Sequence, residues 1–90
     1  MTVIFSKKCE LGLQAVLFLS TLSVGERVNA SQVAEKLKVP KEFVSKVMQI
    51  LTDSGIVASK KGKNGGFSLG KKASDIKLID IVIVLDGPEV

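Results

Sequence analysis

The chain has 90 residues, of which 46% are hydrophobic, and it carries a formal net charge of +4 at pH 7. This length and composition predict one small folded domain over residues 1–90, without low-complexity tracts and without long disordered regions. With no histidine and a single cysteine, Cys9, the sequence excludes an internal disulfide and lacks the ligands of a zinc or other metal cluster.

The first predicted element is a helix from Lys7 to about Leu22, with Ser6 as its N-cap. Its main apolar stripe consists of Leu11, Ala15, Phe18, Leu19 and Leu22. Two lysines before an apolar stretch also fit a signal peptide, but Gln14 interrupts the stretch, which is too short to span a membrane. We therefore expect a cytoplasmic protein without a membrane segment.

A second helix is predicted after Asn29, which stands three residues before Gln32 in the spacing of a capping box. Its buried face follows from apolar residues at helical spacing, namely Ala30, Val33, Ala34 and Leu37. The pattern ends at Pro40, because proline disfavours helical geometry at the preceding residue and suits the start of a new helix. Two helices joined by a tight turn are the result.

The next helix, over residues 41–53, has two unlike faces. Its apolar residues are Phe43, Val44, Val47, Ile50 and Leu51. The opposite face is polar and mostly positive and consists of Lys41, Glu42, Ser45, Lys46 and Gln49. Gly55 stands where a left-handed residue commonly follows the end of a helix.

A β-hairpin is predicted to follow this helix. Residues 56–59 have the β-branched content of a strand, and residues 67–69 alternate as its return strand. Asn64-Gly65 is a strong hairpin-turn dipeptide. The tip is basic and rich in glycine, with the sequence Lys61-Gly62-Lys63-Asn64-Gly65-Gly66. Val28 lies in a short segment that can add a strand beside the hairpin.

The last segment, residues 76–85, is almost entirely apolar. Gly87 and Pro88 indicate a helix stop, whereas the β-branched content also fits a strand, and the sequence leaves both assignments open. A helix of this composition is apolar on nearly every side. Either a partner covers part of it, or it is an ordinary core helix.

The positive charge is concentrated in one part of the chain. Residues 36–72 contain nine lysines against Glu42 and Asp53, a local net charge of +7, whereas the remainder has four basic and seven acidic residues. Clustered lysines are typical of nucleic-acid binding, because each one near a phosphate releases a condensed counterion. A solvated lysine-rich surface is the alternative, which we rank second because the lysines fall on the third helix and the hairpin.

Together these elements predict a mainly α fold with a small β-hairpin wing, the winged helix-turn-helix. Over almost its whole length the chain resembles the Rrf2 family of bacterial transcription regulators. The segments that carry the resemblance are Ser6-Lys7-Lys8, Val33-Ala34-Glu35, the helix from Phe43 to Gly55 with its ending Leu51-Thr52-Asp53-Ser54-Gly55-Ile56-Val57, the wing from Lys61 to Leu69, and Asp75-Ile76-Lys77-Leu78. The G-x-x-G-G-aromatic wing is the most specific of them.

The resemblance implies a regulator, usually a repressor, that binds an inverted-repeat promoter site in double-stranded DNA as a homodimer. The family's recognition helix then falls on residues 41–53 and its wing on residues 60–67. The expected DNA-binding residues are Lys41, Glu42, Ser45, Lys46, Gln49, Lys60, Lys61, Lys63, Asn64, Gly65 and Gly66. We expect the helix to read bases in the major groove and the wing lysines to meet phosphates or the adjacent minor groove.

The chain departs from the family pattern in three places. Leu11 stands where an aromatic residue is common, and Lys77 stands where Ser or Thr usually caps the last helix. The sequence also ends at Val90, before the region that in many members carries three cysteines for an iron–sulfur cluster and a long dimerisation helix. We expect no cofactor on this chain, which is either a fragment or a member without that sensor.

No enzyme is predicted, because the chain has no histidine and its scattered carboxylates offer no pair of nucleophile and base. Residues 65–72 nearly match a phosphate-binding P-loop, but Lys72 replaces the Ser or Thr that holds magnesium. The alternative function is a winged-helix protein–protein interaction module that uses residues 76–85 as its contact face. DNA binding should weaken steeply with salt, whereas an apolar protein interface should not.

Overall fold

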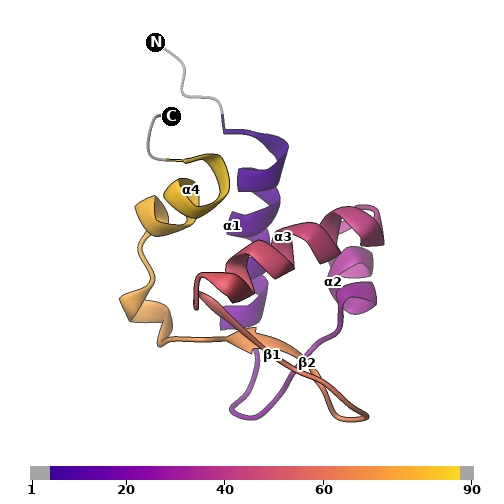
Figure 1. The fold of residues 1–90 in the computed structure, drawn as a ribbon. Helices are drawn as coiled ribbons and strands as arrows, with labels where there is room; N and C mark the ends of the chain where they lie inside the picture. Colours follow the sequence, from indigo (N-terminus) through magenta and orange to yellow (C-terminus); the bar gives the residue numbers. More distant parts are fainter. Residues whose placement is uncertain (1–4, 88–90) are drawn as a thin grey trace.

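The computed structural model describes residues 5–87, and its elements follow the order expected from the sequence (Figure 1). The elements are α1 (Lys7–Ser20), α2 (Ala30–Leu37), α3 (Lys41–Asp53), β1 (Val57–Lys60), β2 (Gly66–Leu69), the short 3-10 helix η1 (Ala73–Asp75) and α4 (Leu78–Asp86). The predicted winged helix-turn-helix, mainly α with a two-stranded antiparallel wing, is confirmed.

Helix α1 begins at its predicted cap, where the Ser6 side chain accepts a hydrogen bond of 3.0 Å from the Cys9 amide. The helix ends at Ser20 and not near Leu22. At this end the hydroxyl groups of Ser20 and Thr21 donate to the carbonyls of Leu17 and Phe18, at 2.6 and 2.7 Å. Hydroxyl groups that bond the nearby backbone in this way compete with regular helix, which explains the earlier stop.

The segment after η1, for which the sequence left helix and strand open, is the helix α4. It starts at Leu78, and Ile76 is still in extended backbone. Helix α4 lies against α1 at Gly12, where any side chain would overlap the Leu85 side chain. The helical form thus lets one side of this apolar segment bury itself against α1. Gly87 follows α4 with φ +87°, as expected of a helix stop, while Pro88 lies outside the described residues.

The capping box predicted for α2 is present in both directions. The backbone amide of Asn29 donates to the side-chain Oε1 of Gln32 at 2.8 Å, and the backbone amide of Gln32 donates to the side-chain Oδ1 of Asn29 at 2.8 Å. Helix α2 ends at Lys38, a non-glycine residue in left-handed backbone with φ +59°, and α3 starts directly after Pro40. The left-handed Lys38 and the start of α3 after Pro40 form the tight turn between the two helices.

Replacing Asn29 with alanine is expected to lower the free energy of unfolding by about 1 kcal/mol, because the Asn29 side chain accepts the bond from the Gln32 backbone amide, while the bond that the backbone amide of residue 29 donates is retained. Urea unfolding followed by circular dichroism measures this loss. The matched control is Ser31→Ala in the first turn of the same helix, which should change stability by less than half as much. Equal losses in the two variants would mean that the capping box contributes nothing of its own.

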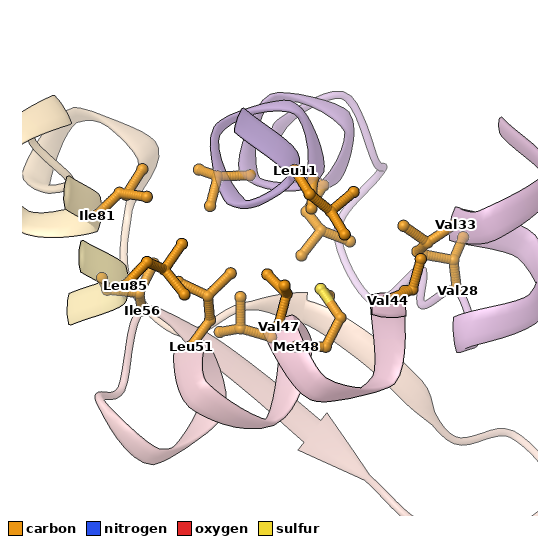
Figure 2. Packing of buried hydrophobic residues seen from close by; sticks show 14 of the residues in the cluster. Leu11, Val28, Val33, Val44, Val47, Met48, Leu51, Ile56, Ile81 and Leu85 are labelled. Carbon is orange, nitrogen blue, oxygen red and sulfur yellow. The ribbon is translucent and has the colours of Figure 1, made fainter. Parts of the chain in front are cut away.

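The core lies between α1 on one side and α3 on the other, with α4 and the hairpin closing it (Figure 2). In Figure 2, Val47, Met48 and Leu51 of α3 point toward the helix that carries Leu11. The fully buried side chains of this cluster include Val33, Val44, Val47, Met48 and Leu51. The apolar face predicted for α3 is therefore the face that holds the helix in place, and it leaves the opposite face free.

The wing is a two-stranded antiparallel hairpin in which Val57 pairs with Leu69 and Lys60 pairs with Gly66. The expected extra strand is a single pair of residues, Val28 and Phe67, which exchange backbone hydrogen bonds of 3.1 and 2.6 Å. The chain before α2 is in this way attached to the wing.

The turn at the tip differs from the prediction that Asn64-Gly65 forms its centre. The amide of Gly65 donates to the carbonyl of Gly62 at 3.0 Å, so Lys63 and Asn64 occupy the two central positions. Positive φ falls at Gly62 and Gly66, with values of +106° and +137°, and not at Asn64 or Gly65. The Lys60–Gly66 pair closes the loop, and a Cβ at Gly65 would overlap the Lys60 carbonyl oxygen.

Not all apolar side chains of α1 and α4 are buried. On α4, Ile81, Val82 and Leu85 face the interior, whereas Leu78, Ile79 and Ile83 are 58%, 54% and 43% exposed. On α1, Leu17 is 67% exposed, whereas its neighbour Val16 is buried. In residues 5–87, no helix combines the length and the apolar character needed to cross a membrane.

Candidate nucleic-acid interface

The polar face predicted for α3 is exposed along its whole length. Val44, Val47, Met48 and Leu51 hold the other face in the core with no exposed surface. The five expected base-reading residues are all exposed, and they are Lys41, Glu42, Ser45, Lys46 and Gln49. The helix therefore presents three kinds of group to solvent, namely ammonium, carboxylate and neutral hydrogen-bonding groups.

The Gln49 side chain is held in place by its own helix. Its Nε2 donates to Asp53 Oδ1 at 2.8 Å, one turn further along α3. An amide group has two N–H donors and one acceptor oxygen, so one donor and the oxygen stay available for a base edge. The sequence suggested Gln49 as a reader but gave no hint of the Asp53 contact that orients it.

The four polar wing residues are exposed at the tip of the hairpin, and they are Lys60, Lys61, Lys63 and Asn64. Gly65 and Gly66 are half-buried. A side chain at Gly65 would overlap the Lys60 backbone, and a Cβ at Gly66 would lie 2.7 Å from the Val28 carbonyl oxygen. Both glycines thus shape the wing, and their contact with DNA stays a prediction.

Helix α3 and the wing are brought together by the short connection at Gly55. In Figure 1, β1 leaves the C-terminal end of α3 and runs back beneath the helix, so that the tip of the wing lies on the same side as the turn between α2 and α3. Gly55 has the expected left-handed φ of +85°. This return of the chain places the expected base-reading and phosphate-binding residues on neighbouring elements.

The structure adds basic residues that the sequence reading did not assign to any site. Arg27, just before the Val28 pair, lines a groove together with Lys71 and Lys72, which follow β2. The two sets are far apart in the sequence, and the Val28–Phe67 pairing joins the segments that carry them. Spacing in the sequence offers no signal for such a groove.

The segment that resembles a P-loop does not have the structure of one. Residues 66–69 form strand β2 in the wing, and the three-residue η1 follows Lys72 in place of a phosphate-binding helix. A phosphate-binding P-loop requires a helix whose N-terminus meets the phosphates. This segment is therefore folded differently from a P-loop.

The residues of this chain do not fit a metal centre or an iron–sulfur cluster. Cys9 is its single cysteine, it has no histidine, and an iron–sulfur cluster needs several thiolate or imidazole ligands. In the part of the chain from residue 5 to 87, no three His, Cys, Asp or Glu side chains gather closely enough to hold a metal ion.

Cys9 is fully buried. Burial raises the pKa of its thiol, and the carboxylates of Asp86 and Glu10 raise the pKa further. Because the thiolate is the reactive form, this cysteine is protonated and inert at neutral pH. The backbone amide and the hydroxyl of Ser6 both donate to Asp86, which ties the start of α1 to the end of α4.

Residues 5–90 match the Rrf2 family, which is described as an iron-dependent transcriptional regulator. The Lactococcus lactis protein YffB, named as an HTH-type transcriptional regulator, is 33% identical over 78 residues, which cover 87% of this chain and 50% of that protein. The chain thus spans about half the length of this curated relative.

Solved structures show the same fold. CymR, the global cysteine regulator of B. subtilis, has a TM-score of 0.91 at 25% identity over 97% of this chain and 67% of that chain. IscR of T. potens has a TM-score of 0.85 at 29% identity over 94% of this chain and 62% of that chain. The matched proteins are regulators, in agreement with the expectation that this domain is not an enzyme. From the family match over residues 5–90 and the shared winged fold, the chain belongs to the Rrf2 family of transcriptional regulators.

Proposed function

We propose that the chain is a sequence-specific DNA-binding transcriptional regulator, in which α3 reads bases and the wing binds the backbone. The observation that carries this proposal is that the exposed polar face of α3 and the exposed wing lysines lie on elements joined directly through Gly55. A helix fits the major groove of B-DNA, and lysines beside it neutralise phosphates.

Each exposed residue of α3 has a partner that its chemistry favours. Lys41 and Lys46 can donate to guanine O6 or N7, and Gln49 can pair with adenine through its free N–H and its oxygen. Ser45 can contact any base that offers a donor or an acceptor. Glu42 accepts from cytosine N4 and repels phosphate, so it favours some sites and opposes others.

The regulator is further proposed to act as a homodimer on an inverted repeat, as a repressor in the cytoplasm. A groove of about 350 Å³ between α1 and α4 is almost wholly apolar, and the exposed Leu17 and Leu78 line it. A second copy that covers these side chains removes apolar surface from water. Two copies related by a two-fold axis read two half-sites in opposite directions, which is an inverted repeat.

No cofactor is assigned to this chain. The family description names iron, but Cys9 is buried and no other cysteine or histidine is present. A signal that this chain senses by itself must therefore act through groups other than a cluster. DNA binding by the purified chain should accordingly be unchanged by an iron chelator.

The test is to incubate the purified chain with fragmented DNA of its own source and to sequence the bound fragments at two salt concentrations. We expect enrichment of an inverted repeat, and a fall in affinity at higher salt of about 0.9 logarithmic units per tenfold salt for each phosphate contact. Light scattering of the complex should give two chains per repeat. Absence of enrichment at both salt concentrations would contradict the proposal.

Substitutions should separate base reading from phosphate binding. Lys46→Ala and Gln49→Ala are each expected to weaken binding to the selected operator by about 1–3 kcal/mol, and much less to unrelated DNA. Lys61→Ala should weaken both by a similar factor and reduce the salt slope by about one contact. Fluorescence anisotropy with the two DNAs at several salt concentrations measures the affinity of each variant and the salt slope, and a uniform loss from all three variants would contradict this division.

The second candidate function is a protein–protein interaction module. It is favoured by the exposed apolar side chains Leu78, Ile79 and Ile83 on α4. An apolar interface holds or strengthens as salt rises, whereas DNA binding weakens. The two-salt selection described above separates the two functions.

A further inference from the structure

A second groove lies at the base of the wing and adjoins the α1–α4 groove, with which it shares Ser20 and Ala73. It has a volume of about 350 Å³, and its walls are the loop between α1 and α2 and the segment that follows β2. The Val28–Phe67 pair joins the two walls. Sites for small molecules in proteins commonly have volumes of about 300–1,000 Å³, so this groove is large enough for one.

The walls of this groove, called here the wing-base groove, are mainly positive. Arg27 stands on one wall and Lys71 and Lys72 stand on the other. The single acidic residue of the lining, Glu26, uses its carboxylate to accept from the Ser23 amide at 2.8 Å within its own loop. The groove thus has three cationic side chains and one carboxylate that is already hydrogen-bonded within its own loop, and this charge favours the binding of an anion.

The lining of the groove is also partly apolar. Leu19 is buried with 3% exposure, and Leu22 and Leu69 are half-buried, and all three line the groove. A DNA phosphate backbone has no apolar body to place on these leucines. A small molecule that carries one carboxylate and an apolar body matches both features, because the leucines gain apolar contact while the cations bind the charge.

We propose that the wing-base groove binds a small amphipathic anion of the carboxylate class and that this ligand acts on the wing. Leu69 of the lining pairs with Val57 in the hairpin, and Arg27 precedes Val28, which bonds to Phe67. A ligand that contacts both walls binds best at one distance between them. Its binding therefore favours the wing position that has this distance. The binding stands on the groove alone, whereas the effect on DNA rests on the proposed function.

The probe for binding is 3-phenylpropionate, titrated into the ¹⁵N-labelled chain at millimolar concentrations and followed by amide chemical shifts. We expect shifts in residues 22–27 and 68–72. Two control ligands separate the contributions, since 3-phenylpropanol has the same body without the charge and acetate has the charge without the body. Both should bind more weakly by roughly tenfold. Equal binding of the alcohol, or shifts confined to the α1–α4 groove, would overturn the proposal.

Two double variants are compared. One carries Lys71→Ala and Lys72→Ala, and the other carries Lys60→Ala and Lys61→Ala. Each removes two positive charges from exposed positions, at opposite ends of the hairpin. The first pair should weaken 3-phenylpropionate by roughly tenfold and the second should leave it unchanged. An equal loss of 3-phenylpropionate affinity in both double variants would mean that the overall charge of the chain causes the effect, and it would overturn the proposed site.

The effect on the wing is measured with the selected operator. Saturating 3-phenylpropionate should change the dissociation constant for DNA by at least about fivefold in the unaltered chain and not in the Lys71→Ala, Lys72→Ala variant. If operator DNA shifts amides 22–27 and 68–72 and the acid does not, the groove is a backbone contact and the proposal is overturned. Acid binding without any DNA binding would instead contradict the proposed function and leave the site intact.

Discussion

Replacing Gly66 with alanine is expected to lower the free energy of unfolding by about 3 kcal/mol and to weaken operator binding with it. Gly66 has φ +137°, a conformation that side chains rarely adopt, and a Cβ would lie 2.7 Å from the Val28 carbonyl oxygen. The backbone on the other side of this contact cannot rotate away as a flexible side chain can. The wing must therefore separate from Val28 or the substitution must strain both segments.

Gly62→Ala is the control for this prediction. Gly62 also has positive φ, +106°, but a Cβ there meets nothing within 4 Å. Its expected loss is the backbone term alone, about 1 kcal/mol. Urea unfolding gives the two stabilities, and amide shifts of Val28 and Phe67 show whether their pairing survives. Equal losses with an intact Val28–Phe67 pair would contradict the close contact as the cause.

Replacing Leu51 with alanine is expected to cost about 3–4 kcal/mol, a large part of the roughly 5–13 kcal/mol that stabilises a domain of this size. Leu51 has no exposed surface and lies where α3 meets the core near α4 (Figure 2). Truncation leaves a cavity that the surrounding helices fill only in part. The urea midpoint measures the loss, and far-ultraviolet circular dichroism at low urea measures the fraction of folded chain.

The control is Ile50→Ala, which removes side-chain atoms from the next position of the same helix. Ile50 is half-buried and packs at the edge of the cluster, so its expected cost is about 1 kcal/mol. A cost for Ile50→Ala as large as that for Leu51→Ala would contradict the assignment of α3's two faces, on which the DNA-reading face also depends.

Local signals in the sequence predicted most of the elements. The capping box at Asn29, the break at Pro40 and the positive φ at Gly55 are decided by residues within one or two helical turns, so a reader of the sequence can place them. The polar face of α3 was likewise predicted, because helical spacing is a property of neighbouring residues. The candidate base-reading residues follow from that face.

Two details of the sequence predictions changed or were decided in the structure at the hairpin tip and in the last segment. Asn64-Gly65 is a favoured turn dipeptide, but the Gly65 amide bonds to the Gly62 carbonyl, so the turn centres on Lys63 and Asn64 within the loop that the Lys60–Gly66 pair closes. The helical form of residues 78–86 was open because their composition fits both a helix and a strand. The contact with α1 at Gly12 gives the helix a surface on which to bury its side.

By itself, the sequence determined the order of the elements, the winged helix-turn-helix and the charged faces of α3 and the wing, because these depend on residues near one another in the chain. Only the tertiary structure decided which apolar side chains of α1 and α4 remain exposed. It also decided that Arg27, Lys71 and Lys72 line the wing-base groove together with three leucines. These arrangements depend on how the loop before α2 pairs with the wing at Val28 and Phe67. The sequence predicted that the Val28 segment lies beside the hairpin, but the packing of the whole domain decides that Val28 pairs with Phe67, so no local spacing records the groove.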